Sequence, residues 1–225
     1  MTATAPSVTG LYVGTSGFSY PSWRGGFYPA GARPDELLRL YAERLPSVEL
    51  NTTSYKLPSE EQFRRWAAET PPSFRFAVKM PRRITHAGRL DGIAPFCERV
   101  RALGERLGPV FVQLPEDRPR DDGLLALLHG SLDPELRYAF DFRHPSWEEA
   151  ELAPAVHVGA IDAGARFRYL RLREPAYGEE ELAALAQRLR PLLRAGVEVY
   201  AYFRHEDEPD APRYAERLCA LLAGA

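Results

Sequence analysis

Short apolar runs alternate along the chain with longer stretches of helical periodicity. Eight runs rich in Val, Phe, Tyr and Leu predict strands, and Gly, Pro or Asn bounds them. The runs cover residues 11–16, 48–51, 74–79, 110–114, 138–142, 156–162, 167–172 and 197–203. Apolar stripes between them predict helices around residues 37–45, 63–67, 124–128, 182–193 and 214–222. A capping box opens the second of these helices at Ser59, and Gly196 ends the fourth.

The alternation of strands and helices predicts parallel pairing, because a strand–helix–strand crossover returns the chain in the same direction. Eight such units predict an α/β fold of the (β/α)₈ TIM-barrel type, in one domain over residues 1–225. About five residues separate the sixth predicted strand from the seventh, which is too few for a helix. We therefore expect a barrel that is shortened or irregular around strands five to seven.

Strand parity predicts which side chains face the barrel axis, because alternate residues point to opposite faces and the helix-facing set should be apolar. Near the carboxyl ends of the strands the inward set is polar: Glu49, Asn51, Lys79, Gln113, Asp141, Arg143, Asp162, Arg171, Tyr202 and Arg204. Any one of these side chains could be a structural ion pair. Seven charges at one mouth indicate function, since an unpaired charge in an apolar core is costly and barrels of this type carry their chemistry there.

Two loops next to this mouth add candidate residues. Residues 79–86, which end at His86, concentrate positive charge that could hold a phosphate or carboxylate, or could form a solvated basic loop. After the fifth strand, His144 is an acid or base suited to neutral pH, or a structural hydrogen-bonding residue. Ser146 begins a capping-box pattern. Trp147 either walls the mouth or packs beneath the loop.

Five segments in order along the chain carry a family resemblance: Gly14–Phe18, Val48–Tyr55, Phe74–Arg82, Ile84–His86 and Asp141–Trp147. Over nearly the whole chain they resemble the YecE-like family, a domain of unknown function. The resemblance implies a TIM-barrel-type fold and brings no established substrate with it. The family's characteristic residues would be Glu49, Asn51, Lys79, Gln113, Arg143, His144 and Trp147. This chain departs from the family's usual pattern at Phe18, at Asp141, at Arg173-Glu174 and at Arg204-His205.

The charge balance excludes a uniformly basic surface. The 225 residues include 29 Lys and Arg against 31 Asp and Glu, a formal net charge of −2, so only a local patch could attract nucleic acid or an acidic membrane. The first 23 residues are uncharged but are interrupted by Gly and Pro, and we expect neither a signal peptide nor a membrane helix. The two cysteines form no C-x-x-C pair, which favours a reducing compartment, the cytoplasm.

Motifs that are specific for one catalytic mechanism are not found in the sequence. Gly14-Thr15-Ser16-Gly17 has neither P-loop nor nucleophile-elbow spacing, and we expect it to let the chain turn tightly at the mouth. The sequence holds no nucleotide fingerprint and no Cys/His cluster, so the cofactor is unknown. A divalent metal among His86, His144, Glu49, Asp141 and Asp162 is possible but has no support from spacing.

Two hypotheses follow. The first is an enzyme with hydrolase- or isomerase-type acid/base chemistry on a small anionic or polyhydroxylated metabolite. Glu49, Asp141 and His144 would be its acid/base groups, while the substrate would be held by Lys79, Arg143, Arg171, Asn51, His86, Gln113, Trp147, Asp162, Tyr202 and Arg204. The second is a non-catalytic module that captures an anion, or less favourably a nucleic-acid backbone, through residues 79–86. A small anionic molecule is the expected partner, and no membrane is expected.

Overall fold

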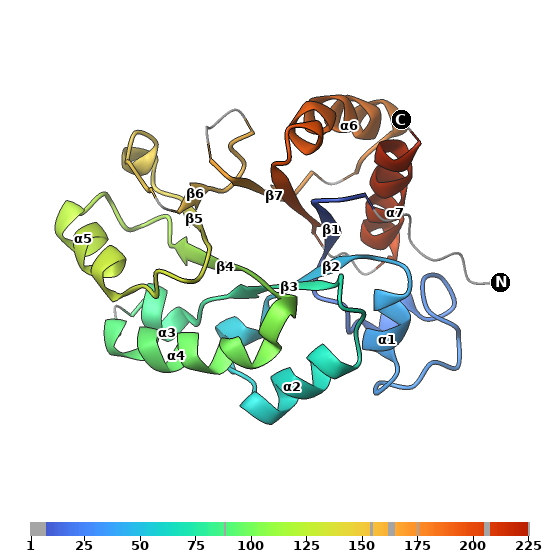
Figure 1. Ribbon diagram of the computed structural model, residues 1–225, viewed down its shortest axis with the longest axis horizontal. Coiled ribbons are helices and arrows are strands. Elements are labelled where there is room, and N and C mark those ends of the chain that lie inside the picture. The colour runs from blue at the N-terminus through green and yellow to red at the C-terminus, as the bar shows by residue number, and fades with distance from the viewer. Residues whose placement is uncertain are drawn as a thin grey trace.

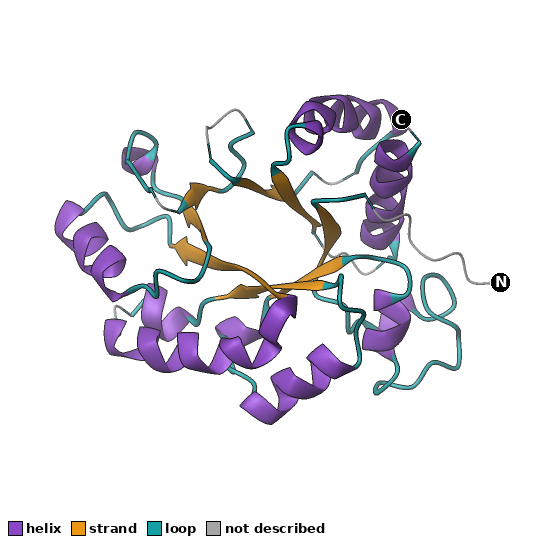
Figure 2. Ribbon diagram, in the orientation of Figure 1, coloured by secondary structure: helices purple, strands orange, loops and turns teal. Residues whose placement is uncertain are grey.

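All eight predicted strands are present and pair in parallel in one sheet. The computed structural model describes residues 8–87, 89–153, 155–161, 165–174, 176–204 and 208–224. The strands are β1 Leu11–Ser16, β2 Ser47–Leu50, β3 Arg75–Lys79, β4 Leu107–Leu114, β5 Tyr138–Phe142, β6 Val156–His157, β7 Phe167–Leu172 and β8 Glu198–Phe203. Their order is β6-β5-β4-β3-β2-β1-β8-β7, and Figure 2 shows them curled into a ring.

The ring is irregular where β6 meets β7, as expected from the short connection. The sixth strand was predicted over residues 156–162, but β6 has only two residues. Gly159, with φ of +89°, turns the chain out of the extended conformation, so the longer strand was wrong. Its N–H donates to the carbonyl of Tyr169 at 2.8 Å, which links the two sides of the nearly closed barrel.

Helices surround most of the ring (Figures 1 and 2). The α-helices are α1 Leu37–Ala42, α2 Glu60–Ala68, α3 Arg82–Thr85, α4 Ile93–Val100, α5 Asp122–Ser131, α6 Glu179–Arg194 and α7 Asp210–Ala223. The short 3₁₀ helices are η1 Pro21–Trp23, η2 Thr52–Ser54, η3 Leu90–Gly92, η4 Arg101–Arg106 and η5 Pro145–Trp147. Within the described residues, η5 is the only helical turn between β5 and β7, because these links are too short for a full crossover helix.

Local sequence signals account for two of the helix ends. The Oγ of Ser59 accepts the N–H of Gln62 at 3.1 Å and so caps α2, as predicted. Gly196 lies just after α6 with φ of +76°, the left-handed conformation in which helices commonly end. The predicted basic loop after β3 is partly helical, since α3 lies within it.

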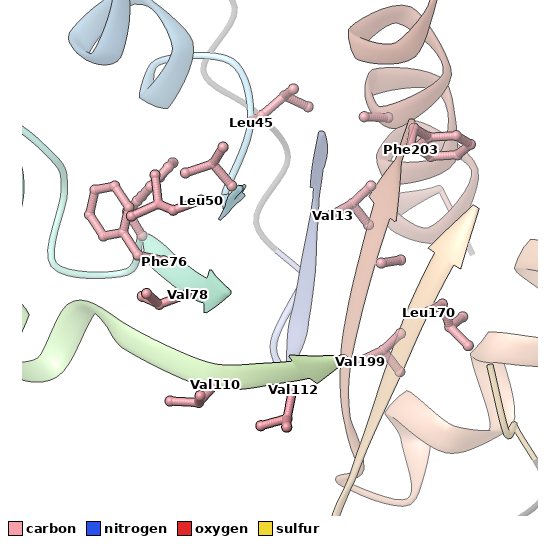
Figure 3. Close-up of a cluster of buried hydrophobic side chains, with 14 of the residues drawn as sticks. Val13, Leu45, Leu50, Phe76, Val78, Val110, Val112, Leu170, Val199 and Phe203 are labelled. Carbon is pink, nitrogen blue, oxygen red and sulfur yellow. The ribbon is translucent and has the colours of Figure 1, made fainter. Parts of the chain in front are cut away.

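Strand parity is confirmed by the packing. The helix-facing layer includes the strand residues labelled in Figure 3: Val13, Leu50, Phe76, Val78, Val110, Val112, Leu170, Val199 and Phe203. A separate buried cluster fills the axis and consists of Ala77, Phe111, Ala139, Val156, Phe167, Tyr169, Tyr200 and Tyr202. The interior is thus a packed core, as is usual in TIM barrels.

The amino-terminal end of the barrel is closed by a paired charge. Arg137, which precedes β5, forms an ion pair with Glu198 at the start of β8. It also donates to the hydroxyl of Tyr200 at 2.8 Å. Since the axis is filled and this end is paired, space for a ligand is expected at the carboxyl ends of the strands.

No helix in the described ranges is both long and apolar enough to cross a bilayer. The cysteines Cys97 and Cys219 are both buried and free. Burial raises the pKa of the Cys219 thiol to about 12, so it stays protonated and unreactive at neutral pH.

Candidate active site at the barrel mouth

Side chains from five strands meet at the carboxyl end of the barrel: Glu49 of β2, Lys79 of β3, Gln113 of β4, Asp141 of β5 and Arg171 of β7. Contacts of 2.6–3.7 Å join them in a row, from Glu49 through Arg171, Asp141 and Gln113 to Lys79. All five hold the inward positions that parity predicts. Because each is carried by a strand, the rigid sheet fixes their relative positions.

Glu49 is a fully buried carboxylate surrounded by hydrogen-bond donors. Its carboxylate accepts hydrogen bonds from the side chains of Ser16 at 3.0 Å, Asn51 at 3.0 Å, Tyr169 at 2.7 Å, Arg171 at 3.0 and 3.1 Å, and Arg173 at 3.4 Å. We call these six residues the Glu49 cluster. The Glu49 side chain is 0% exposed, so its carboxylate is held by protein donors alone.

The charge state of Glu49 follows from these neighbours. Burial by itself raises the pKa of Glu49, but the charges of Arg171 and Arg173 outweigh burial and hold the pKa at about 2. A general base or acid works best when its pKa lies near the working pH. The acid/base role of Glu49 stays a prediction; the observed contacts are those of a carboxylate that holds two guanidinium groups in place.

Gln113 links the carboxylate of Asp141 to the amine of Lys79. The Nζ of Lys79 donates to Gln113 Oε1 at 2.8 Å, and Gln113 Nε2 donates to Asp141 Oδ2 at 2.6 Å. Asp141 also lies 3.7 Å from Nη1 of Arg171 and 3.4 Å from Nε of Arg143. Its side chain is 22% exposed, so a ligand in the mouth can reach this carboxylate, unlike Glu49.

The pKa of the Lys79 amine is lower than that of an ordinary lysine. Burial, followed by the nearby charge of Arg171, lowers its pKa from 10.5 to about 8, although Glu49 and Asp141 act in the opposite direction. A substantial fraction of this amine is therefore neutral just above neutral pH. Such an amine can accept a proton or act as a nucleophile, which an ordinary lysine does poorly.

Positive charge exceeds negative charge in the inner mouth. Two carboxylates, Glu49 and Asp141, face three arginines, Arg143, Arg171 and Arg173, in addition to the partly neutral Lys79. At the rim, Glu116 and Asp117 lie opposite Arg82 and Arg143 in the cleft wall; Glu116 reaches Arg143 at 3.4 Å and is 77% exposed and screened by solvent. Among the described residues, Nη1 of Arg173 finds no hydrogen-bond partner although it is buried. The inner mouth thus has charge and a donor to offer an anion.

An open cleft of about 460 Å³ lies at the Lys79–Gln113 end of this row. We call it the Lys79 cleft, and it is lined by Tyr55, Lys79, Arg82, His86, Gln113, Pro115, Glu116, Asp117 and Arg143. Its volume lies within the range of small-molecule sites. His86, predicted to bind substrate, lies in this cleft with its Nδ1 2.8 Å from the hydroxyl of Thr85. Burial and the charge of Arg82 lower the pKa of His86, which favours the neutral ring.

A second cavity of about 590 Å³ lies beside the mouth, between the ends of β1 and β2 and the helices α1 and α2. Phe18 and Trp66 form an aromatic part of its wall, with ring centroids 6.2 Å apart. Asn51 lines this cavity and also donates to Glu49, so it connects the cavity to the Glu49 cluster.

Trp147 and Tyr202, both among the predicted substrate-binding residues, are buried and contact protein groups in this structure. Trp147 is 1% exposed, packs against Phe142 and donates to the carbonyl of Arg118, so it packs beneath the loop. Tyr202 is 0% exposed and its hydroxyl lies 2.7 Å from that of Ser47, within the packed axis. Aromatic side chains with one polar atom commonly fill such positions.

His144 has a structural hydrogen-bonding partner, which is one of the two roles expected for it. Its Nδ1 lies 2.8 Å from the Ser146 hydroxyl and accepts the Ser146 N–H at 3.2 Å, which makes His144 the cap of η5. The predicted capping box beginning at Ser146 is therefore wrong: the Ser146 hydroxyl accepts the N–H of Arg120 at 2.7 Å. A capping histidine fixes the loop without taking part in the row described above.

Replacing this cap gives a direct test of its role. We expect His144→Ala to lower the free energy of unfolding by about 1 kcal/mol, as loss of a cap does. We also expect it to change the affinity of the mouth for inorganic phosphate by less than about twofold. Chemical denaturation and a calorimetric titration measure the two effects. If the folded His144→Ala protein binds phosphate much more than twofold more weakly, His144 takes part in binding at the mouth.

Two further predicted residues remain to be located. Asp162 is outside the described residues, as are residues 205–207. Arg204 follows β8 with an exposed side chain, and its N–H donates to the carbonyl of Leu172 at 2.9 Å.

Three members of the Glu49 cluster were not among the predicted site residues: Ser16, Arg173 and Tyr169, of which parity had placed Tyr169 on the inward face. Tyr169, Arg171 and Arg173 occupy every second position along β7 and just beyond it, so extending the inward parity by one step would have found Arg173. Ser16 ends β1 next to Glu49, and only the β1–β2 register reveals the pair.

The described residues hold no group of three or more His, Cys, Asp or Glu side chains that could bind a metal ion. The carboxylates of Glu49 and Asp141 instead lie against arginines.

Comparison with known proteins adds family information to this geometry. A family profile described as "Protein of unknown function DUF72" matches residues 12–225. The chain is 35% identical over 165 residues to UPF0759 protein YecE of Escherichia coli (strain K12), which covers 68% of this chain and 57% of YecE. It thus spans a little over half the length of that relative. UPF0759 protein YunF of Bacillus subtilis (strain 168) is 29% identical over 86 residues, 38% of this chain and 29% of YunF.

Two crystal structures share the fold. A DUF72 family protein from Thermotoga maritima superposes with a TM-score of 0.80 at 26% identity, covering 94% of this chain and 98% of that one. A DUF72 family protein from Enterococcus faecalis gives a TM-score of 0.77 at 20% identity, covering 94% and 95%, and this second likeness concerns the fold alone.

Proposed function

The chain belongs to the DUF72 family of proteins of unknown function, as its five sequence segments indicated, and we propose that its barrel mouth is an enzyme active site for a small anionic metabolite. The observation that carries this proposal is the excess of cations in the inner mouth, together with the buried Nη1 of Arg173 that lacks a partner among the described residues. An anionic group bound there would satisfy both the charge and the donor.

The residues divide into three roles in this proposal. Arg143 and Arg173 hold the anionic group, with Arg171 behind them. Glu49 positions Arg171 and Arg173 through the contacts of the Glu49 cluster. Lys79 and Asp141, joined through Gln113, are the pair that accepts and returns a proton during an isomerase- or hydrolase-type reaction. This proposal retains Asp141 as an acid/base group and assigns Lys79, Gln113, Arg143 and Arg171 to the substrate, and it gives proton transfer to Lys79 in place of Glu49 and His144.

A barrel that binds anions without chemistry is the second candidate. It is favoured by the basic segment 79–86, of which Lys79, Arg82 and His86 line the Lys79 cleft. The same segment could meet a nucleic-acid backbone, in which case binding would fall steeply with salt. Turnover of any compound in a metabolite screen supports the enzyme, whereas binding with no turnover supports the module.

Arg143→Gln is the substitution that tests anion binding with least damage to the fold. The Arg143 side chain is 42% exposed and makes only contacts of 3.4 Å, so its loss should change stability by less than about 1 kcal/mol. We expect the affinity for inorganic phosphate to fall about tenfold, because one charge-assisted hydrogen-bonding group is lost. Calorimetric titration at low salt measures the change.

Arg120→Gln is the matched control. Arg120 is 36% exposed and pairs with Asp122 at the start of α5, so the variant loses the same charge elsewhere on the surface. Phosphate affinity in this variant should equal that of the unsubstituted protein. Equal affinity in all three proteins, or no measurable binding of phosphate or 2-oxo acids by any of them, would contradict the proposed function.

A further inference from the structure

We propose that Nζ of Lys79 is a nucleophile that forms an imine with the carbonyl carbon of a small anionic aldehyde or ketone bound in the Lys79 cleft. This inference rests on the proposed function, because the arginines of the mouth must hold the anionic end of the substrate while the carbonyl group reaches the lysine. It adds a covalent step and a substrate class to the proton transfer proposed above.

The composition of the chain singles out this residue. Of the 29 basic residues, 27 are arginine and only two are lysine, Lys56 and Lys79. A chain that otherwise uses arginine for nearly every positive charge keeps a lysine at the carboxyl end of β3, inside the mouth. Arginine stays protonated and could provide the charge at this position, but only lysine can provide a neutral amine.

The geometry holds this amine in place beside the proposed anion site. Lys79 ends β3, so its backbone is fixed by the sheet, and its Nζ donates to Gln113 at 2.8 Å. Nζ lies 5.4 Å from the centroid of the Phe111 ring, and the Arg171 guanidinium lies 4.3 Å from the same centroid. Arg143 lines the same cleft. A carbonyl compound anchored by a guanidinium would thus meet the amine at close range.

The surrounding charges favour the neutral form of the amine. The groups that act on Lys79 come from three strands: Arg171 on β7, Glu49 on β2, and Asp141 and Arg143 at the end of β5. Burial and Arg171 prevail, so the pKa of Lys79 falls to about 8. Desolvation next to another cation is a known means of activating a lysine for imine formation.

The step balances without an added oxidant or reductant. The nitrogen lone pair of the neutral amine adds to the carbonyl carbon, while the carbonyl oxygen takes up a proton and the nitrogen gives one up. This produces a carbinolamine. Elimination of that oxygen as water leaves a C=N bond, whose protonated form withdraws electrons from the adjacent carbon and so eases loss of a proton there. Asp141 is the nearby carboxylate suited to receive that proton.

Reductive trapping tests the inference. The full chain is incubated with sodium cyanoborohydride and either pyruvate, a 2-oxo acid, or glycolaldehyde phosphate, a phosphorylated aldehyde, near pH 8. Peptide mass spectrometry then locates adducts whose mass equals that of the probe less one oxygen atom. We expect the adduct on Lys79, with about tenfold or more label than on Lys56, because the mouth holds the probe beside Nζ. The more strongly labelling probe identifies the source of the anionic group.

Three comparisons control the experiment. Lys56→Arg should keep full label on Lys79 and bind inorganic phosphate as the unsubstituted protein does, while Lys79→Arg should lose the label at position 79. Methyl pyruvate, which has the same carbonyl group without the negative charge, should label Lys79 about tenfold less than pyruvate. Label should also increase as the pH rises through about 8, since only the neutral amine attacks.

The outcomes separate the two proposals. If the unsubstituted protein binds pyruvate or phosphate in a titration but gives no adduct on Lys79, or labels Lys56 equally, the imine is ruled out and the proposed function stands. If no small anion binds, the proposed function fails. Equal labelling by pyruvate and methyl pyruvate would overturn the anionic substrate class. The result for the unsubstituted protein is decisive even if Lys79→Arg does not fold.

Discussion

Glu49→Gln is expected to lower the free energy of unfolding by about 3–5 kcal/mol, the usual cost of removing one partner from a buried ion pair. The Glu49 side chain is fully buried, and its partners Arg171 and Arg173 are 11% and 30% exposed. An amide fills the same space but removes the negative charge that both guanidinium groups face. Two buried cations would then repel each other with no carboxylate between them.

Denaturant unfolding measures this effect, with Glu43→Gln as the matched control. Glu43 pairs with Arg39 at 2.6 Å on the exposed surface of α1, where both side chains are more than one third exposed. Removing that pair should cost about 0.5 kcal/mol or less. A similar small loss for Glu49→Gln would show that Glu49 does not hold the mouth together.

The pH dependence of the free energy of unfolding should differ between the unsubstituted protein and the Glu49→Gln variant. Because the pKa of Glu49 is about 2 when folded and 4.5 as its ordinary value, its stabilising effect is complete above about pH 4.5. It is then lost as the pH falls toward 2. In the Glu49→Gln variant this contribution is absent, so the difference in stability between the two proteins should shrink across that range.

Gly14→Ala is expected to cost about 4 kcal/mol or more, or to prevent folding, because there is no space for a methyl group at this position. A Cβ on Gly14 would lie 1.8 Å from the Ser47 carbonyl oxygen and 2.8 Å from the Tyr41 hydroxyl. The first of these is backbone of the paired strand β2, which cannot move aside without breaking the sheet. The glycine is needed for this close approach. The tight turn expected in this segment belongs to Gly17, with φ of +96°.

Thermal or chemical unfolding of the soluble fraction measures the Gly14→Ala effect. Gly130→Ala is the control, because Gly130 lies in α5 with nothing within 4 Å of an added Cβ. Alanine is the better helix former, so this second change should raise stability by up to about 1 kcal/mol. A Gly14→Ala protein as stable as the Gly130→Ala protein would mean that β1 and β2 are not packed as described.

The fold could be predicted because its signals are local. Period-two alternation in β3, β4 and β8 identifies both the strands and the sides that they present, and the outer and inner clusters confirm it. The short links around β6 predicted the irregular part of the barrel for a similar reason, since the reach of a few residues is set by chain geometry. The length of β6 was wrong, because Gly159 leaves the strand in a conformation that an apolar pattern does not signal.

The chemistry of the candidate site could be predicted only in part. Parity gathered Glu49, Asp141, Lys79 and Arg171 at one end, and the contacts among them follow. The low pKa of Glu49 could not be predicted from the sequence, because it depends on Arg171, 122 positions away along the chain. For His144 and Trp147 the sequence left a site role and a structural role open, and the hydrogen bonds to Ser146 and Arg118 hold both residues in the loop.

The sequence by itself determined the number and order of the strands, their inward and outward faces, and the end of the barrel where charge collects. These properties depend on the spacing of side chains along one strand, which the chain carries in its own order. Only the tertiary structure decided that the ionised Glu49 carboxylate is paired with arginines and that the pKa of the Lys79 amine is lowered. It also decided that Nη1 of Arg173 has no hydrogen-bond partner among the described residues. Burial and charge act through space between residues of different strands, and the closing of the barrel sets the distances between them.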